Sequence, residues 1–216
     1  MAIPEITQTK STLVPNLAYA QLASDAQIER AAKALEANGI KVIIAANGEE
    51  AKQRLFELIP AGAEVFTGSS MTLEALGIPA EVDKRYDSVR ARLATMNPQT
   101  QMREMIKMGA VPEWMVGSVH AVTEDGTVVI ASNTGSQLAG YAASAAHVVW
   151  IVGAQKIVPN LEEAFKRIRE YSLPLEDERA LKAYGMNSNI SKLLIVHREV
   201  MPGRTTMIIV KENLGF

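Results

Sequence analysis

Short β-branched runs alternate with amphipathic helical segments along the first half of the chain, and this alternation constrains the fold more than any other feature. Residues 40–45 and 63–67 are such runs, and residues 25–38 and 48–58 have apolar positions at helical spacing. A strand and helix that repeat every 20 to 25 residues or so are typical of parallel βαβ crossovers. The sequence therefore predicts an α/β fold with a mostly parallel, Rossmann-like sheet flanked by helices.

Local signals mark where the first helix begins and ends. Ser24 followed three residues later by Gln27 has the form of a capping box, in which two side chains satisfy backbone donors at a helix start. Asn38 and Gly39 come where a left-handed residue would end that helix. We expect further helices over 86–95 and 98–108, within a helical side segment that covers about residues 80–110.

Two antiparallel hairpins are expected to interrupt the parallel pattern. The first lies near 115–132, where Asp125-Gly126 joins two apolar runs, and Asp-Gly between strands is a strong hairpin signal. The second lies near 192–211, around Pro202-Gly203. The strand over 205–211 would then be an exposed edge, which favours a homo-oligomer.

The chain shows no repeat, low-complexity tract or linker, so its simplest division is an N-terminal arm over 1–23 and a single domain over 24–216. The first residues lack the basic flank and the apolar stretch of an export signal. No apolar run reaches the 20 or so residues that are needed to cross a bilayer. We therefore expect a cytoplasmic protein that does not interact with membranes.

Composition excludes several classes of function. The 216 residues hold 22 Lys and Arg against 24 Asp and Glu, a net charge of −2, so nothing indicates a nucleic-acid partner. The absence of cysteine excludes disulfides, thiolate zinc sites, protein-ligated iron–sulfur clusters and a cysteine nucleophile. The three histidines lack the spacing of a helical zinc pair, so no metal site is predicted.

Two polar, glycine-containing turns are candidate ligand sites because each lies between a predicted strand and a predicted helix. In the first, the candidate binding residues are Gly68, Ser69, Ser70 and Thr72; in the second, they are Asn133, Thr134, Gly135, Ser136 and Gln137. Backbone N–H groups at a helix start attract phosphate or carboxylate, and ligands of open α/β sheets collect at the carboxyl ends of strands. Ordinary helix caps would use the same residue types. Neither turn matches the dinucleotide or Walker phosphate motif, so no cofactor is predicted.

His120 and Glu124 are the candidate catalytic residues. Strand alternation places His120 on one face with Val122, and imidazole is the side chain best suited to acid–base chemistry near neutral pH. The competing explanation for His120 is a structural role as a hydrogen-bonded histidine in a half-buried strand. The neighbouring Asp125 is explained by the hairpin turn without any catalytic role. If the protein is an enzyme, these residues predict acid–base chemistry.

Five segments together resemble the LUD domain of the lactate utilisation protein C family. They are residues 67–74, 117–126, 131–138, 152–159 and 210–216, and the resemblance extends from about Ser24 to the C-terminal end. It implies the α/β fold of the NagB/RpiA/CoA-transferase-like proteins, with ligand-holding loops that would correspond to residues 68–72 and 133–137. The family is linked to the oxidation of lactate to pyruvate alongside iron–sulfur partner proteins.

The resemblance leaves two functions open. One is the binding of a small anionic metabolite, an organic acid or a phosphorylated compound. If the protein is an enzyme, His120 or Glu124 would then perform acid–base chemistry on an organic acid or a sugar-phosphate-like substrate. The other is a non-catalytic assembly subunit of an iron–sulfur lactate-oxidising complex, which would bind the partner proteins of lactate oxidation. Many family members carry a cysteine cluster before the final strands; residues 185–190 hold none here, so cluster binding does not carry over.

Overall fold

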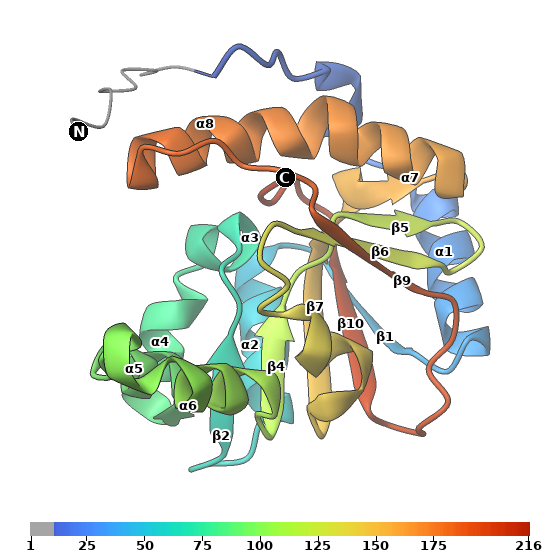
Figure 1. Ribbon diagram of the computed structural model, residues 1–216. Coiled ribbons are helices and arrows are strands. Elements are labelled where there is room, and N and C mark those ends of the chain that lie inside the picture. Colours follow the sequence, from blue (N-terminus) through green and yellow to red (C-terminus); the bar gives the residue numbers. More distant parts are fainter. Residues whose placement is uncertain (1–10) are drawn as a thin grey trace.

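A six-stranded parallel sheet forms the centre of the fold (Figure 1). The computed structural model describes residues 11–216. Across the sheet the strands are β1 (Lys41–Ala45), β10 (Thr205–Val210), β7 (His147–Gly153), β4 (Trp114–Gly117), β2 (Glu64–Thr67) and β3 (Asp87–Ser88). All neighbours pair in parallel. The predicted α/β architecture is confirmed.

Helices cover both faces of this sheet. They are α1 (Asp25–Ala37), α2 (Gly48–Leu58), α3 (Met71–Ala75), α4 (Ile78–Arg85), α5 (Val89–Ala94), α6 (Pro98–Ala110), α7 (Leu161–Arg167) and α8 (Leu173–Tyr184). Short helical turns are η1 (Leu17–Ala20), η2 (Gly140–Ser144), η3 (Ala154–Lys156) and η4 (Ile168–Ser172). The side segment expected over 80–110 is the run from α4 to α6, and the capping box of Ser24 and Gln27 is formed at the start of α1.

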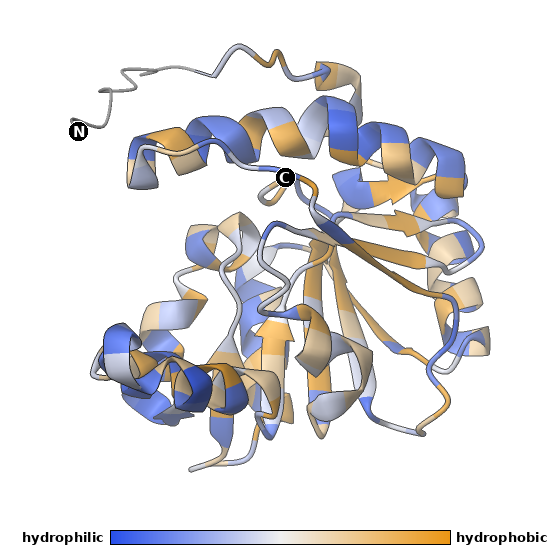
Figure 2. Cartoon of the chain, viewed as in Figure 1, coloured by the Kyte–Doolittle hydropathy of each residue, from blue (hydrophilic) through white to orange (hydrophobic). Residues whose placement is uncertain are grey.

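The central strands separate two cores because alternate residues point to opposite faces. Trp150 and Val152 of β7 face the core shared with α1, whereas Val149 and Ile151 face the core shared with α2, α3 and α4. Figure 2 shows these strands as almost uniformly apolar and the surrounding helices as two-sided. A strand covered on both faces reads as a continuous apolar run, as β7 does in the sequence.

A second, mixed sheet of four strands stands beside the first. Its order is β8 (Ile157–Val158), β5 (Ala121–Thr123), β6 (Val128–Ser132) and β9 (Lys192–Val196). β5 and β6 pair antiparallel around Gly126, whose φ of +81° suits glycine, so the expected hairpin is confirmed there. The first part of the 115–132 segment instead belongs to the parallel sheet as β4, because the chain leaves that sheet at residues 118–120.

The prediction of a hairpin near 192–211 is wrong. β9 pairs antiparallel with β6, whereas β10 lies between β1 and β7 in the parallel sheet. All six residues of β10 are buried, which suits the middle of a parallel sheet and not an exposed edge. The stated reason for expecting a homo-oligomer therefore fails, since the parallel sheet ends at β1 and β3.

The described part of the predicted arm, residues 11–23, lies against the α7–α8 segment; its first ten residues lie outside the described part of the chain. The Asn16 N–H donates to the carbonyl of Glu170, and the Tyr19 hydroxyl donates to Glu163 at 2.9 Å. Over residues 11–216, no helix is long and apolar enough to cross a bilayer.

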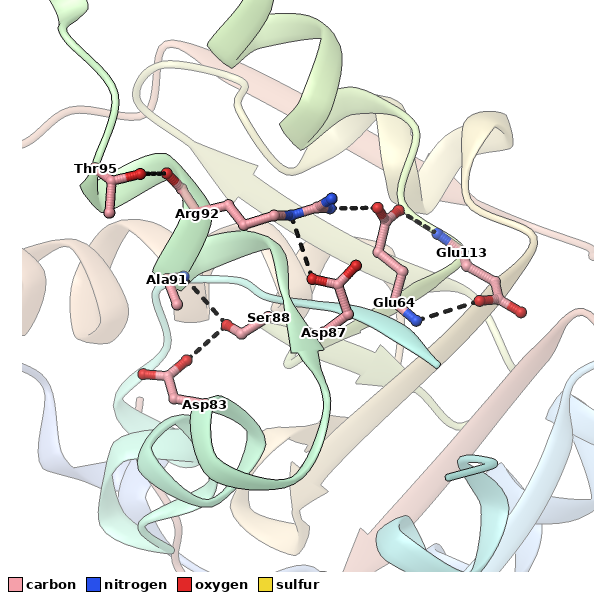
Figure 3. A network of polar contacts seen from close by, with 8 residues as sticks. All are labelled: Glu64, Asp83, Asp87, Ser88, Ala91, Arg92, Thr95 and Glu113. Carbon is pink, nitrogen blue, oxygen red and sulfur yellow. Dashed lines mark hydrogen bonds and ion pairs between the residues drawn. The ribbon is translucent and has the colours of Figure 1, made fainter. Parts of the chain in front are cut away.

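A polar network ties α5 to the edge of the sheet where β2 begins (Figure 3). Arg92 pairs with Glu64 and, at 3.4 Å, with Asp87. Ser88 caps α5 through the Ala91 N–H and donates to Asp83 at 2.6 Å. The network lies at the start of β2, so it leaves the opposite end of that strand free for the site described next.

Candidate functional site

A cleft of about 640 Å³ opens beyond the carboxyl ends of the parallel strands. One wall comes from the segments that follow β2, β4 and β6, and the other comes from η4, α8 and residues 186–190. Figure 1 shows α8 lying across this end of the sheet, with the C-terminal end of the chain beneath it. This is the position at which open α/β sheets hold ligands.

The structure brings the two predicted polar turns together in this cleft. The Gln137 side-chain amide donates to the main-chain carbonyl of Ser69 at 3.2 Å, which joins the turns directly. An added Cβ at Gly68 would lie 3.0 Å from Gln137 and 3.2 Å from the Tyr141 hydroxyl, so the close approach needs glycine. The predicted residues that line the cleft are Ser69, Ser70, Asn133, Thr134, Ser136 and Gln137.

The other three predicted turn residues do not line the cleft. Gly68 lies behind the wall, and Gly135 has a φ of +87°, which serves the turn itself. Thr72 is buried, and its hydroxyl donates to the carbonyl of Leu214 at 3.0 Å. These residues shape the site and do not present groups to a ligand in this structure.

Two buried basic residues that the sequence analysis missed lie near the cleft, Lys156 in its lining and Arg167 behind it. Lys156 lines it, and its Nζ donates to Thr72 Oγ1 at 2.9 Å, to Ser118 Oγ at 3.1 Å and to the main-chain oxygen of Phe216 at 3.1 Å. Burial first, and then the charge of Arg167, hold the pKa of Lys156 well below its usual range. Its position inside the apolar run 148–158 was the available signal, because a charged residue is almost never buried without a partner.

Arg167, the second of these residues, lies directly behind the wall formed by His120 and Ser172. It donates from Nη1 to the carbonyl of His120 at 2.5 Å and to Ser172 Oγ at 3.0 Å, and Nη2 has no hydrogen-bond partner among the described residues. Burial lowers the pKa of Arg167 to about 10, so the guanidinium remains charged at neutral pH.

Over residues 11–216, neither basic residue has an Asp or Glu side chain within ion-pair distance. Lys156 Nζ is 3.1 Å from the main-chain oxygen of Phe216, the last residue of the sequence, so the missing counter-charge is that of Arg167. The buried Arg204 shows the contrast, because its Nη1 pairs at 2.7 Å with Glu199, whose side chain is 9% exposed. A buried charge without a counter-ion is costly. The cost is expected where the protein must hold an anion that it does not itself supply.

His120 lines the same cleft and is held in one tautomer. Its Nδ1 accepts the Ala131 N–H at 3.1 Å, so the neutral ring carries its proton on Nε2. Burial, and then the charges of Lys156 and Arg167, lower the pKa of His120 to about 3. At neutral pH the ring is therefore a neutral hydrogen-bond donor, and its acid–base role stays a prediction.

Glu124 is placed away from the cleft. Its carboxylate accepts from Arg30 Nε at 2.7 Å and from Gln27 Nε2 at 3.0 Å, which ties the β5–β6 turn to α1. These hydrogen bonds, led by that from Arg30, lower the pKa of Glu124. The structure does not bring Glu124 together with the predicted binding residues, because β5 carries the chain from the cleft toward α1.

Acidic groups at the cleft are few. Glu176 is held by Arg179 through two hydrogen bonds of 2.7 and 2.6 Å, and Glu74 is exposed. Over residues 11–216 no group of three His, Asp or Glu side chains is placed to hold a metal ion. The chemistry that the cleft offers is hydrogen bonding and positive charge.

Comparisons with known proteins agree with this architecture. The sequence model of the family described as LUD domain matches residues 28–210. The fold is similar to the crystal structure of a DUF162 family protein from Deinococcus radiodurans, with a TM-score of 0.54 and 10% sequence identity over 88% of this chain and 99% of that one. A comparison with curated proteins found no match.

Proposed function

The chain belongs to the LUD-domain family, and we propose that it binds a small anionic metabolite, an organic acid or a phosphorylated compound, in the cleft beyond the parallel strands. The observation that supports this most directly is the buried Arg167, which is charged, has no carboxylate partner over residues 11–216 and has an unpaired Nη2. Arg167 does not line the cleft, but an anion bound there would lie across the wall of His120 and Ser172 and would act as its counter-charge through that wall.

Neutral donors around the cleft support the same proposal. Ser69, Ser70, Thr134 and Ser136 carry hydroxyls, Asn133 and Gln137 carry amides, and all six line the cleft. Hydrogen bonds to a charged acceptor contribute about 1.5 to 3 kcal/mol, more than neutral ones. His120 adds a further donor at Nε2, which favours binding and orientation of the anion.

Thermal unfolding with added anions tests the proposal. Lactate, pyruvate, a sugar phosphate and inorganic phosphate are added in turn to the protein, and a ligand at 100 times its Kd stabilises the folded state by about 2.7 kcal/mol. We expect at least one of these anions to raise the Tm. The shift should be lost when Ser69→Ala and Ser70→Ala are combined and when Lys156 is replaced by Met.

Lys33→Met is the matched control. It removes one lysine amine, as Lys156→Met does, but from an exposed position on α1 that does not line the cleft. Its Tm should therefore shift with the anion as in the parent protein. A shift that both lysine variants lose equally would not depend on the cleft and would contradict the proposed site.

The assembly-subunit hypothesis predicts a different result. If none of the anions shifts the Tm of the parent protein, the metabolite proposal is overturned, and binding of iron–sulfur partner proteins becomes the hypothesis to test. Co-elution with such a partner in size-exclusion chromatography, unaffected by Ser69→Ala and Ser70→Ala, would support it.

A further inference from the structure

The cleft contains an amine in an environment that suits covalent chemistry. The Lys156 side chain is only 1% exposed, yet it lines the cleft and ends among two hydroxyls and one main-chain oxygen. No Asp or Glu side chain of the described residues holds it as an ammonium ion. Lysines are activated as nucleophiles by desolvation or by a neighbouring cation, and here burial first, and then the charge of Arg167, lower the pKa of Lys156.

The hydrogen-bond partners of Lys156 accommodate the neutral amine. A neutral amine has two N–H donors and one lone pair. Thr72 Oγ1 already donates to Leu214, so it accepts from Nζ, and the Phe216 oxygen only accepts. Ser118 Oγ is the third partner, 3.1 Å from Nζ and in the lining of the cleft. Its proton is directed to the Val119 carbonyl at 3.5 Å, a long contact that a rotation of the hydroxyl would exchange for the lone pair of the neutral amine.

A donor for an electrophile lies in the same wall. His120 follows Ser118 by two residues, lines the cleft and carries its proton on Nε2, which forms no hydrogen bond among residues 11–216. A neutral N–H of this kind can donate a hydrogen bond to a carbonyl oxygen and stabilise the negative charge that develops there during addition. The carbonyl carbon would then face the amine, while an anionic group of the same molecule is held by the polar turns.

From this arrangement we propose that Lys156 forms an imine with a small aldehyde or ketone that also carries an anionic group. The proposal rests on the anion site proposed above. The Nζ lone pair adds to the carbonyl carbon, and one amine proton passes to the oxygen to give a carbinolamine. The C–O bond then breaks, the second amine proton leaves with the hydroxyl as water, and a C=N bond remains. No electrons are gained or lost, and Ser118 and His120 are positioned to carry the protons.

Reductive trapping tests the proposal. The protein is incubated with glyoxylate and cyanoborohydride, and the adduct is located by peptide mass spectrometry. We expect one adduct per chain, on Lys156. Acetaldehyde has the same reacting group without the carboxylate, and at equal concentration it should label Lys156 at least about tenfold less, since a hydrogen-bonded charge contributes 1.5 kcal/mol or more.

Labelling and thermal unfolding separate this proposal from the anion site. Lys156→Arg cannot form an imine, so it should lose the adduct, whereas the anion site is tested independently by the Tm of the parent protein with added anions. Lys33→Met should be labelled like the parent protein. If anions raise the Tm of the parent but Lys156 is not labelled, the imine is overturned and the anion site stands. Labelling that follows lysine exposure across the surface would also overturn the imine.

Discussion

Lowering the pH from about 8 to about 5 should remove about 2 kcal/mol of folding free energy through His120 alone. Its pKa is lowered from 6.5 to about 3 in the folded protein, with burial as the main cause. Between these pKa values His120 is protonated in the unfolded chain but not in the folded chain. The stability that neutral His120 contributes above pH 6.5 is therefore lost as the pH falls toward 3.

The magnitude follows from the two pKa values. At about pH 5 an unfolded histidine is almost fully protonated, whereas the folded ring carries almost no proton. Protonation therefore favours the unfolded state over the folded state by a factor of about 30, which corresponds to about 2 kcal/mol. Any folded pKa below about 4 gives the same figure at that pH. After burial, the charges that keep His120 neutral are those of Lys156 and Arg167, which belong to the proposed anion site.

Urea unfolding of the parent protein and His120→Asn at both pH values measures this contribution. Asparagine can still accept the Ala131 N–H but does not titrate, so the variant should lose about 2 kcal/mol less between the two pH values. Carboxylates with lowered pKa, such as Glu124, Asp177 and Glu199, also lose stability as the pH falls. They do so in both proteins, so the difference isolates His120.

Lys33→Met is the control, because it changes an exposed side chain of α1 and keeps His120, so it should lose as much stability as the parent protein between the two pH values. Equal losses in His120→Asn and the parent protein would refute the reasoning, since they would mean that the ring is protonated in the folded state as readily as in the unfolded one.

Three further predictions concern packing and charge. Glu199→Gln should lower the free energy of unfolding by about 3 kcal/mol, because it leaves a buried arginine unpaired. Glu124→Gln breaks a partly exposed pair and should lower it by less than about 1 kcal/mol. Chemical unfolding would show the difference, and equal losses would contradict it. Ser24→Ala removes the capping box of α1 and should cost about 1 kcal/mol in calorimetry; an unchanged Tm would contradict it. Gly117→Ala would place a Cβ 1.7 Å from the Tyr141 hydroxyl and should cost about 1 to 3 kcal/mol in urea unfolding, with no loss as the contrary result.

The candidate site was partly predictable from local signals. Ser69, Ser70 and residues 133–137 stood out because polar, glycine-containing turns between strands and helices are visible in the sequence. Lys156 and Arg167 did not, because their importance comes from the absence of a carboxylate partner, and partners are brought together by folding. Arg204 is equally buried, and only the structure shows that Glu199 neutralises it.

The sequence by itself determined the local elements: the capped start of α1, the apolar strand β7, the hairpin at Gly126 and the alternation that predicts a parallel sheet. These depend on interactions between residues close in the chain. Only the tertiary structure decided that β10 lies between β1 and β7, that β9 joins the second sheet, and that Glu124 faces α1. Strand order and charge pairing depend on contacts between distant segments, and an apolar strand carries no local mark of which neighbours will bury it.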